Sequence, residues 1–263
     1  MKIPPIPHRW RLTPRQAVAV QRRLAARVSE SPSLGPVRLV AGLDAAYSPR
    51  ENLCFAAAVV WDVETQRVVE QAVAWRKVRF PYIPGLLSFR EAPALLAALR
   101  KLRHTPDVLL CDGQGRAHPR RFGIACHLGV ICDMPAIGCA KSVLVGTHES
   151  PALRRGARAP LREGDEILGA VLRTQTGVRP VFVSVGHRVD LPTCVRVVLA
   201  CATRFRVPEP IRLADQLVGR VRRQWESGEL GGAQVRGPNK ITAVPTRQSA
   251  APSTSQRSGR KCS

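Results

Sequence analysis

The sequence predicts an α/β protein with a single domain, in which helices flank a mixed, partly parallel β-sheet. A chain of 263 residues favours one large domain, because a domain of that size buries roughly 70% of its unfolded surface. Strand-like runs come first without helices and then alternate with helical patterns, which is typical of a mixed sheet. From about residue 227 the composition changes to Gly, Pro, Ser, Thr, Gln and Arg. We therefore expect a folded domain at 1–226 and a disordered basic tail at 227–263.

The N-terminal part is expected to hold one helix and three strands. The helix begins at Thr13, which caps it, with Pro14 at the first helical position and Gln16 closing a capping box. One face of this helix is apolar and consists of Ala17, Val20, Leu24 and Val28. Strands are expected at 37–47, 54–61 and 66–75, with a turn at 62–65. Three consecutive strands indicate that the sheet starts as an antiparallel meander.

The segment from 80 to 102 combines a stiff loop with a helix. Two prolines and a glycine within 80–85 exclude regular structure there. Residues 86–102 follow a helical pattern in which Glu91 shares the apolar face. Pro93 leaves two possibilities open, a helix that begins near Arg90 and a helix that kinks at the proline.

The central stretch at 106–130 is a short apolar strand followed by a glycine turn. The strand stops at Asp112, whose carboxylate a buried strand would not carry without a partner. Gly113 and Gly115 supply a turn where backbone can pass close to a ligand. Further elements are expected as a helix at 122–130, a strand at 135–140, an exposed Arg-rich insertion at 148–164, strands at 166–173 and 180–185, a helix at 191–204 and a last helix from 208.

The charge balance predicts a polyanionic partner. The chain has 41 Lys and Arg against 19 Asp and Glu, a formal net charge of +22, and 32 of the basic residues precede Gln216. A folded domain this basic most often binds nucleic acid, while a solvated charged surface in an Arg-rich proteome is the alternative.

Cysteine usage and hydropathy indicate a reduced compartment and no membrane span. Eight cysteines form no CxxC pair, and most lie inside apolar runs, so we expect reduced core residues and no zinc site. The most continuous apolar run, 54–61, is far shorter than the roughly 20 residues that span a bilayer, and no signal-peptide core is visible. We expect a soluble, cytoplasmic protein.

Four acidic residues stand out because each lies among apolar residues: Asp44, Glu91, Asp112 and Asp215. Two carboxylates about 4 Å apart repel by roughly 4 kcal/mol at an effective dielectric near 20, and a divalent cation reverses the sign of that energy. Oxygen ligands favour Mg²⁺, or Mn²⁺ as a substitute, over zinc, and such ions in a basic protein serve phosphoryl chemistry. Taken singly, each acid is equally compatible with a cap or a buried ion pair.

Several other residues carry candidate roles in phosphate or base binding. Lys141 follows a strand and could neutralise charge on an attacked phosphate, although an ordinary surface lysine has the same pattern. His118 and His187 could each move a proton or hold a phosphate, and His187 could instead cap a turn. Arg120 and Arg121 bind phosphate in any nucleic-acid interpretation. An exposed Tyr82 could wedge between bases, whereas a buried one would be a core aromatic.

These segments together resemble the endonuclease V family. The resemblance runs in order from about Ala17 to Asp215 and is strongest in the central block. Its motifs are GLDAAY at 42–47, PYIPG at 81–85 with FRE at 89–91, DGQGRAHPRRFGIACHLGV at 112–130, AKS at 140–142, VGH at 185–187 and PEPIRLAD at 208–215.

The resemblance implies a ribonuclease H-like fold and nicking of DNA at the second phosphodiester bond 3′ to deoxyinosine. Such a nick leaves 3′-hydroxyl and 5′-phosphate ends in the repair of deaminated adenine. Asp44 and Asp112 match the family's metal ligands, and Glu91 and Asp215 complete the acidic cluster. Lys141 and His118 match positions near the scissile phosphate. The family's strand-separating wedge corresponds to Pro81, Tyr82, Ile83 and Pro84, and the substrate floor to Gly113, Gly115, Arg120 and Arg121.

Three other functions remain open at this point. An inosine-specific endoribonuclease acting on single-stranded RNA would share every motif, because nothing in the sequence settles a 2′-hydroxyl contact. Another ribonuclease H-like nuclease would share the acids without the PYIP loop. A catalytically silent nucleic-acid-binding protein would explain the charge alone. We expect a monomer whose partner is DNA containing deoxyinosine, with inosine-containing RNA as the alternative.

Overall fold

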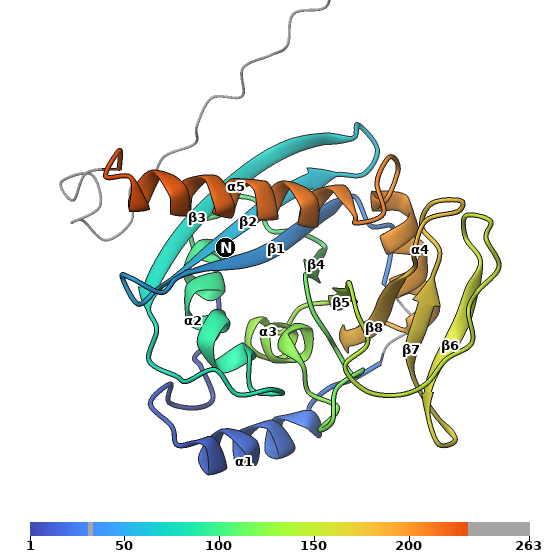
Figure 1. Cartoon of the computed structure of the whole chain (residues 1–263), viewed down its shortest axis with the longest axis horizontal. Coiled ribbons are helices and arrows are strands. Elements are labelled where there is room, and N and C mark those ends of the chain that lie inside the picture. The colour runs from blue at the N-terminus through green and yellow to red at the C-terminus, as the bar shows by residue number, and fades with distance from the viewer. Residues whose placement is uncertain (31–33, 231–263) are drawn as a thin grey trace, which may run out of the picture.

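The structure, a computed structural model, describes residues 1–30 and 34–230 and is built on one eight-stranded sheet (Figure 1). The strands lie in the order β3-β2-β1-β4-β5-β8-β7-β6. Their bounds are β1 Leu39–Ser48, β2 Leu53–Asp62, β3 Arg67–Lys77, β4 Val108–Cys111, β5 Ala136–Ala140, β6 Arg158–Glu163, β7 Glu166–Leu172 and β8 Val181–His187. The helices are α1 Pro14–Ala25, α2 Ser88–Leu99, α3 Ile124–Cys132, α4 Leu191–Cys201 and α5 Glu209–Glu226.

The sheet is mixed, as the sequence predicts. Strands β3, β2 and β1 form an antiparallel meander, whereas β1, β4 and β5 run parallel to one another. The second half, β5-β8-β7-β6, returns to antiparallel pairing. The parallel centre matters most for function, because the carboxyl ends of β1, β4 and β5 are on the same edge of the sheet.

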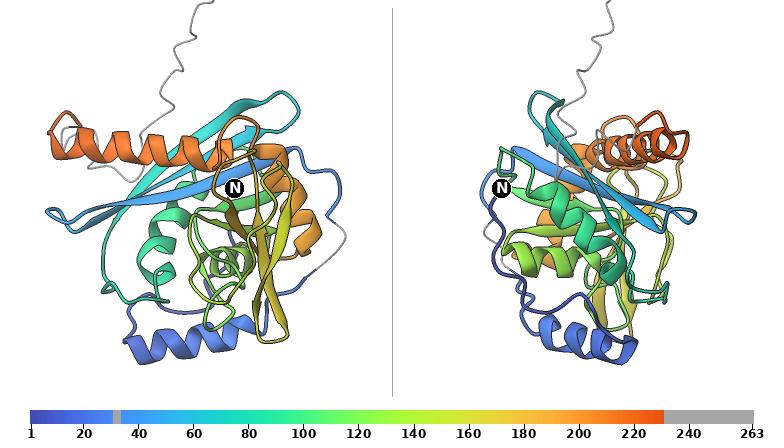
Figure 2. Two further views of the ribbon diagram at one scale, coloured as in Figure 1. Left: turned by 45° about the vertical axis from the view of Figure 1, so that its right-hand side comes forward. Right: turned by 90° about the vertical axis from the view of Figure 1, so that its left-hand side faces the viewer.

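Helices cover both faces of the sheet. Strand β2 is buried along its whole length, and its residues alternate between the two layers. Cys54, Ala56 and Ala58 pack in the core that contains α2 and α3, whereas Phe55 and Ala57 pack against α5. Helix α4 covers the second half of the sheet on the α5 side, and α1 and α5 lie at opposite ends of the molecule (Figures 1 and 2).

Gly42 allows α5 to lie directly against β1. A Cβ atom at this position would lie 2.1 Å from the carbonyl carbon of Pro210, which is far inside van der Waals contact. The obstacle is backbone, so a rotamer change cannot relieve it. The close approach places the N-terminal turns of α5, and with them Asp215, beside the strand that carries Asp44.

Two predicted helices differ from the structure at their ends. The capping box at Thr13 is confirmed, but α1 ends at Ala25, so Val28 lies beyond the helix and packs on the core from a turn. Helix α2 runs from Ser88 to Leu99, shorter at both ends than the expected 86–102, and it begins two residues before Arg90. Pro93 lies inside the helix, where it cannot donate the usual hydrogen bond to the carbonyl four residues earlier.

The predicted Arg-rich insertion at 148–164 is only partly an insertion. Residues 158–163 form β6, an edge strand that pairs with β7 and shows the pattern of an exposed edge, with only Leu161 buried. Arginines on the exposed face hide the strand pattern, because an edge strand needs only one buried face. The tail predicted at 227–263 lies outside the described residues from 231 onward.

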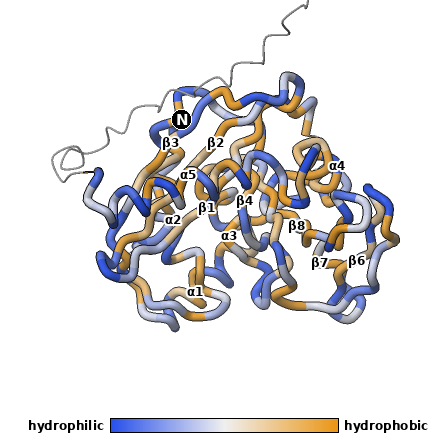
Figure 3. Tube along the Cα trace, turned by 45° about the horizontal axis from the view of Figure 1, so that its top comes forward, coloured by the Kyte–Doolittle hydropathy of each residue, from blue (hydrophilic) through white to orange (hydrophobic). Residues whose placement is uncertain are grey.

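The hydropathy of the chain follows this architecture. Apolar residues concentrate on the central strands and polar residues on the outer loops (Figure 3). Seven cysteines in the described part are free and buried, which confirms reduced core residues there. Within residues 1–30 and 34–230 there is no helix with the length and hydropathy needed to cross a membrane.

Candidate active site

Three candidate residues meet at the carboxyl-terminal edge of the parallel strands. Leu43 of β1 lies opposite Cys111 of β4, so Asp44 and Asp112, the next residue in each strand, are neighbours. The amide of Asp112 donates to the Leu43 carbonyl over 3.0 Å, which continues the pairing up to the acid. Lys141 follows β5, and its Nζ lies 2.5 Å from Asp112 Oδ2. Residues nearly 100 positions apart therefore share one edge because three strands run in the same direction.

Glu91 joins this group from helix α2 and is 9% exposed. Tyr47, three residues after Asp44 on β1, donates its hydroxyl to Glu91 Oε1 over 3.3 Å. Burial, followed by the charges of Asp44 and Asp112, raises the pKa of Glu91 to about 8. Burial, followed by the charge of Asp112, also raises the pKa of Asp44 to about 8, and Asp215 adds to it. The protein thus keeps carboxylates close together that repel one another in the absence of a cation.

The chemistry of this donor set fits a hard divalent cation. Its candidate ligands are carboxylate oxygens, and burial, followed by mutual repulsion, raises the pKa values of Asp44 and Glu91. A cation would offset both effects. Within the described residues no three His, Cys, Asp or Glu side chains converge on one point closely enough to hold a metal ion. The ammonium of Lys141 instead balances Asp112. Cation binding therefore requires Asp112 to exchange its lysine partner and the carboxylates to draw together.

Lys141 responds to the same charges. Burial lowers the pKa of its ammonium, but the hydrogen bond to Asp112 and the charges of Asp112, Asp44 and Asp215 outweigh that effect and raise it. The side chain is about half exposed. Lys141 is therefore a charged, accessible group at the edge of the acidic cluster.

A cavity of about 320 Å³ opens beside the acids. Its walls come from the loop at 82–85, the first turn of α2, the turn at 112–114 and the segment at 140–144. Asp112 and Lys141 line one side, and Tyr82 stands at the rim with 69% of its surface exposed. The loop predicted to be a wedge is thus next to the predicted catalytic acids, and its aromatic ring is free to contact a partner.

The wedge loop is fixed through the carbonyl of Gly85. This oxygen accepts hydrogen bonds from Gln21 Nε2 at 2.9 Å, His118 Nε2 at 2.9 Å and Arg120 Nη2 at 2.6 Å. Gly85 has a φ of +75°, a conformation that favours glycine. Arg120 also donates from Nε to Gln21. Arg120 thus holds the loop, and a direct contact to phosphate would require it to leave these partners.

His118 is a neutral, anchored ring in the described structure. Its Nδ1 accepts from the Arg120 amide over 3.1 Å, so Nε2 carries the hydrogen that it donates to Gly85. Burial is the main cause that lowers the pKa of His118, to about 4. His118 lines the cavity, but both ring nitrogens are engaged, so its geometry is that of a group positioning the wedge loop.

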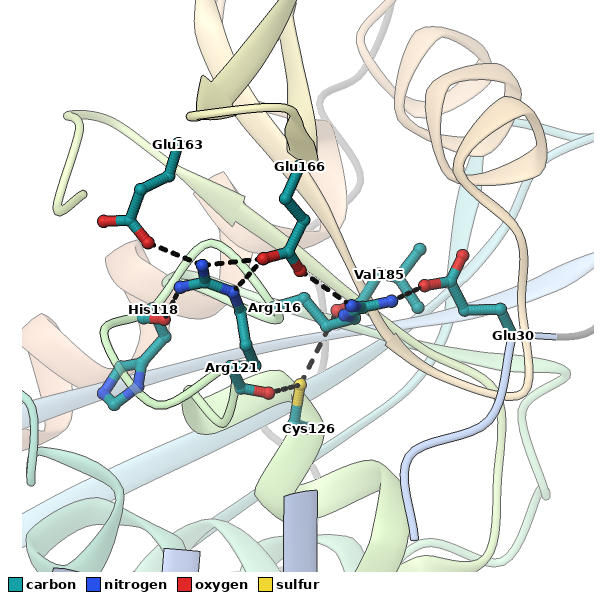
Figure 4. Close-up of polar contacts among 8 residues, drawn as sticks. All are labelled: Glu30, Arg116, His118, Arg121, Cys126, Glu163, Glu166 and Val185. Atoms are coloured by element: carbon teal, nitrogen blue, oxygen red, sulfur yellow. Dashed lines mark hydrogen bonds and ion pairs between the residues drawn. The ribbon is translucent and has the colours of Figure 1, made fainter. Parts of the chain in front are cut away.

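Arg121 lies in an ion-pair network rather than toward the cavity (Figure 4). Its guanidinium contacts Glu163 at 2.5 Å and Glu166 at 2.7 Å, and Arg116 bridges Glu166 to Glu30. The predicted phosphate contact of Arg121 stays a prediction, and it would require the guanidinium to leave two carboxylates of the β6–β7 hairpin. The network ties the hairpin to the turn after β4.

His187 is separated from the acidic cluster, and its predicted contact with substrate stays a prediction. The register of β5 and β8 places His187 opposite Ala136, the first residue of β5, whereas Lys141 follows the last residue of that strand. His187 Nδ1 accepts from the Ser29 amide, and Nε2 lies 3.7 Å from Asp133. It therefore connects the N-terminal segment to the edge of the sheet opposite the acidic cluster.

The glycines of the central turn are required by close packing. Gly113 has a φ of +148°, and a Cβ at Gly115 would lie 2.1 Å from the Val185 carbonyl oxygen. The turn can therefore cross β8 at backbone distance and return to α3. Gly113 lines the cavity, whereas Gly115 is buried under the turn.

Sequence reasoning missed three residues that shape the site. Gln21 anchors the wedge loop from α1, Tyr47 contacts Glu91, and Gln114 lines the cavity and donates to the Ser142 carbonyl over 2.9 Å. Tyr47 and Gln114 lie inside the resembling motifs, so their place in those motifs was a usable signal. For Gln21 the sequence offered no such signal except its position on the buried side of an otherwise basic helix.

Comparison with known proteins identifies the family of this chain. The family model for endonuclease V matches residues 22–216. An endonuclease V of Roseiflexus castenholzii is 55% identical over 219 residues, which is 83% of this chain and 98% of that protein. The crystal structure of endonuclease V from Streptomyces avermitilis is 47% identical and superposes with a TM-score of 0.80 over 84% of this chain and 98% of that one.

A further relative is the Ciona intestinalis endonuclease V, solved in complex with a 24mer DNA containing an inosine followed by a ribo-adenosine. It is 28% identical, with a TM-score of 0.70 over 80% of this chain and 98% of that one. Fold, site and relatives together define the class of the protein as a nuclease. More particularly, the chain belongs to the endonuclease V family.

Proposed function

We propose that this protein is a Mg²⁺-dependent endonuclease, a deoxyribonuclease V, that initiates repair of deaminated adenine in DNA. It nicks the second phosphodiester bond 3′ to deoxyinosine and leaves 3′-hydroxyl and 5′-phosphate ends. One observation carries the proposal: Asp112, which belongs to the carboxylate cluster, and its partner Lys141 line a cavity together with an exposed aromatic loop. Inosine-containing DNA in the Ciona complex supports the choice of substrate.

The acidic edge provides the groups that the reaction needs. Asp44 and Asp112 would hold Mg²⁺, or Mn²⁺ as a substitute, with Glu91 and Asp215 completing the set, and the bound ion supplies an activated water and a stabilised leaving oxygen. Lys141 exchanges Asp112 for a phosphate oxygen and neutralises charge there. Tyr47 keeps the Glu91 carboxylate oriented through its hydroxyl.

The cavity and the wedge loop account for recognition of the altered base. Hypoxanthine pairs weakly, so the cost of extruding it from the stack is low. A cavity of about 320 Å³ has the volume of a small-ligand site, and a flipped base fits that range. Tyr82 takes the place that the base vacates, because its ring stands exposed at the rim and its loop is held at Gly85.

An inosine-specific endoribonuclease is the second candidate. The DNA in the Ciona complex carries a ribo-adenosine directly after the inosine, which brings a 2′-hydroxyl next to the site in that relative. The same cavity and acids would serve DNA and RNA. The two functions therefore differ in whether the enzyme prefers deoxyribose or ribose beside the scissile phosphate.

The deciding experiment presents matched DNA and single-stranded RNA oligonucleotides, each with one inosine, with Mg²⁺ present or withheld. We expect nicking of DNA one nucleotide beyond the inosine, only with Mg²⁺, and at least tenfold faster than nicking of RNA, a preference of about 1.4 kcal/mol. Oligonucleotides with adenosine in the same position serve as controls. Faster cleavage of RNA would favour the second candidate, and cleavage independent of inosine would end the proposal.

A further inference from the structure

A hydrogen-bonded pair of histidines, one partly buried and one fully buried, links the N-terminal segment to the wall of the cavity. His127 of α3 is fully buried, and its Nε2 lies 2.8 Å from His8 Nε2. Its other ring nitrogen, Nδ1, lies 2.9 Å from the hydroxyl of Ser88, the first residue of α2. His8 Nδ1 lies 2.8 Å from the Arg9 carbonyl oxygen. The function proposed above assigns no role to these residues.

The surroundings keep both imidazoles neutral. The rings of Trp10, Phe89 and Phe122 lie around His127 with centroid distances of 5.0 to 5.6 Å. Burial lowers the pKa of His127 well below its usual value, with the charge of His8 as the second cause. Burial is also the largest cause that lowers the pKa of His8.

Because both rings are neutral, the direction of each hydrogen bond between Ser88, the two histidines and Arg9 is determined. The Arg9 carbonyl can only accept, so His8 Nδ1 carries the hydrogen and His8 Nε2 accepts. His127 must then donate from Nε2, which leaves its Nδ1 as an acceptor for the Ser88 hydroxyl. Each ring is thereby held in a single tautomer, and the chain of bonds runs from Ser88 to Arg9.

This relay holds Ser88 at the start of α2, one turn before the contact between Glu91 and the Tyr47 hydroxyl. The N-cap position, Leu87, provides no side-chain hydrogen bond. Ser88 lines the cavity, and Glu91 follows it by one helical turn, so the two side chains lie on the same side of α2. Phe89, between them, packs on the His127 ring. Orientation of the first turn of α2 thus sets the position of the Glu91 carboxylate.

We infer that His127 is a positioning residue, which acts with His8 and Ser88 to hold α2 so that Glu91 reaches the cation and the cavity keeps its shape. The inference rests on the proposed function. It gives the N-terminal segment a role in the active site, because His8 lies at the end of the relay opposite Ser88.

The first test is spectroscopic and uses the whole chain labelled with ¹⁵N. Long-range proton–nitrogen correlation spectra of the imidazoles distinguish the tautomers directly. We expect His8 with hydrogen on Nδ1 and His127 with hydrogen on Nε2, both neutral at pH 7. Either ring in the opposite tautomer, or protonated at that pH, would overturn the relay.

The second test measures function in the variants Ser88→Ala, His127→Phe and the double variant. Mn²⁺ binding, followed by electron paramagnetic resonance without DNA, should weaken about tenfold in each single variant, within the range seen for groups that orient metal ligands. The kcat for nicking should fall by a similar factor with little change in KM. Both changes interrupt the same series of hydrogen bonds. The Mn²⁺ affinity of the double variant should therefore be no more than about twofold lower than that of the single variant with the lower affinity.

A matched control is Trp10→Phe, which changes the same aromatic cluster without removing a hydrogen bond of the relay. It should keep Mn²⁺ affinity within about twofold, as expected when the relay is intact. If His127→Phe does not fold, Ser88→Ala decides, since it removes only a hydroxyl. Unchanged Mn²⁺ affinity in folded Ser88→Ala would refute the inference. Failure of the unaltered chain to nick inosine substrates would count against the proposed function, while Mn²⁺ binding would still decide on the relay.

Discussion

Asp112 is the residue on which the acidic site depends most, because it has two incompatible partners. Its carboxylate receives the Lys141 ammonium at 2.5 Å and raises the pKa of both Asp44 and Glu91. A cation between these acids would release Lys141 toward the substrate. In the described structure the lysine contact balances the charge of Asp112.

Asp112→Ala tests this directly. We expect nicking to fall by about 1000-fold or more, because several kcal/mol of charge stabilisation are lost with the cation. Binding of inosine DNA, measured by fluorescence anisotropy in the absence of Mg²⁺, should stay within about threefold, since the change removes a negative charge facing a polyanion. Asp165→Ala removes an exposed carboxylate from the β6–β7 hairpin and should leave both properties unchanged. Undiminished nicking by Asp112→Ala would contradict the assignment.

Among the elements, the wedge loop at 81–85 shows how a segment without regular structure becomes rigid. Prolines limit its backbone, and three donors from α1 and the central turn converge on the Gly85 carbonyl. Ile83 also packs on the core beneath α1. Tyr82 is exposed together with Pro81 and Pro84, so the loop presents its one aromatic ring at low entropic cost.

For this loop we expect Tyr82→Ala to weaken activity on duplex substrates more than activity on single-stranded substrates. Stability should change by less than about 0.5 kcal/mol, because the ring is largely exposed. The KM for inosine in a duplex should rise about tenfold, since replacing lost stacking is worth a few kcal/mol per base step, while the KM for a single strand changes little. Leu153→Ala, at a similarly exposed apolar residue outside the cavity, is the control. Equal losses on both substrates would argue against a wedge.

The molecule as a whole combines a strongly basic chain with a buried acidic cluster. The formal net charge of +22 attracts nucleic acid from a distance, while the cluster keeps Asp44 and Glu91 with pKa values of about 8. Neutral histidines affect the pH dependence of stability in the opposite direction, because the fold lowers the pKa values of His8, His118 and His127.

These shifts predict how the stability of the metal-free protein depends on pH. Between pH 6.5 and 8 the unfolded chain has neutral histidines and ionised acids, whereas the fold still binds protons at Asp44 and Glu91. Because the folded state holds more protons there, its stability should fall as the pH rises through this window. Below pH 6.5 the histidines oppose the trend, since protonation then favours the unfolded chain.

Urea unfolding in EDTA at several pH values between 6.5 and 8 measures this slope. Mg²⁺ should flatten it, because a bound cation favours the ionised acids and offsets the burial and the repulsion that raise both pKa values. The variants Asp44→Asn and Glu91→Gln should each reduce the slope without Mg²⁺. A stability that is constant or rises over the window in EDTA would show that the acids are not forced together in the folded state.

The sequence by itself determined the mixed α/β class, the capping box at Thr13, the reduced cysteines and the motifs that place the chain in its family. These features depend on local pattern: alternation in strands, apolar runs, and residues close together in the chain. It also marked Asp44, Glu91 and Asp112 as unusual, because a charge inside an apolar run is visible without a fold.

Which of the marked residues meet depends on the tertiary structure. Parallel pairing of β1, β4 and β5 brings Asp44, Asp112 and Lys141 to one edge, while the register of β5 and β8 places His187 away from it. Arg121 has the pattern of a phosphate ligand, and the fold pairs it with carboxylates of β6 and β7. The physical reason is that strand register and ion pairing join residues far apart in the chain, and local sequence carries no record of such partners.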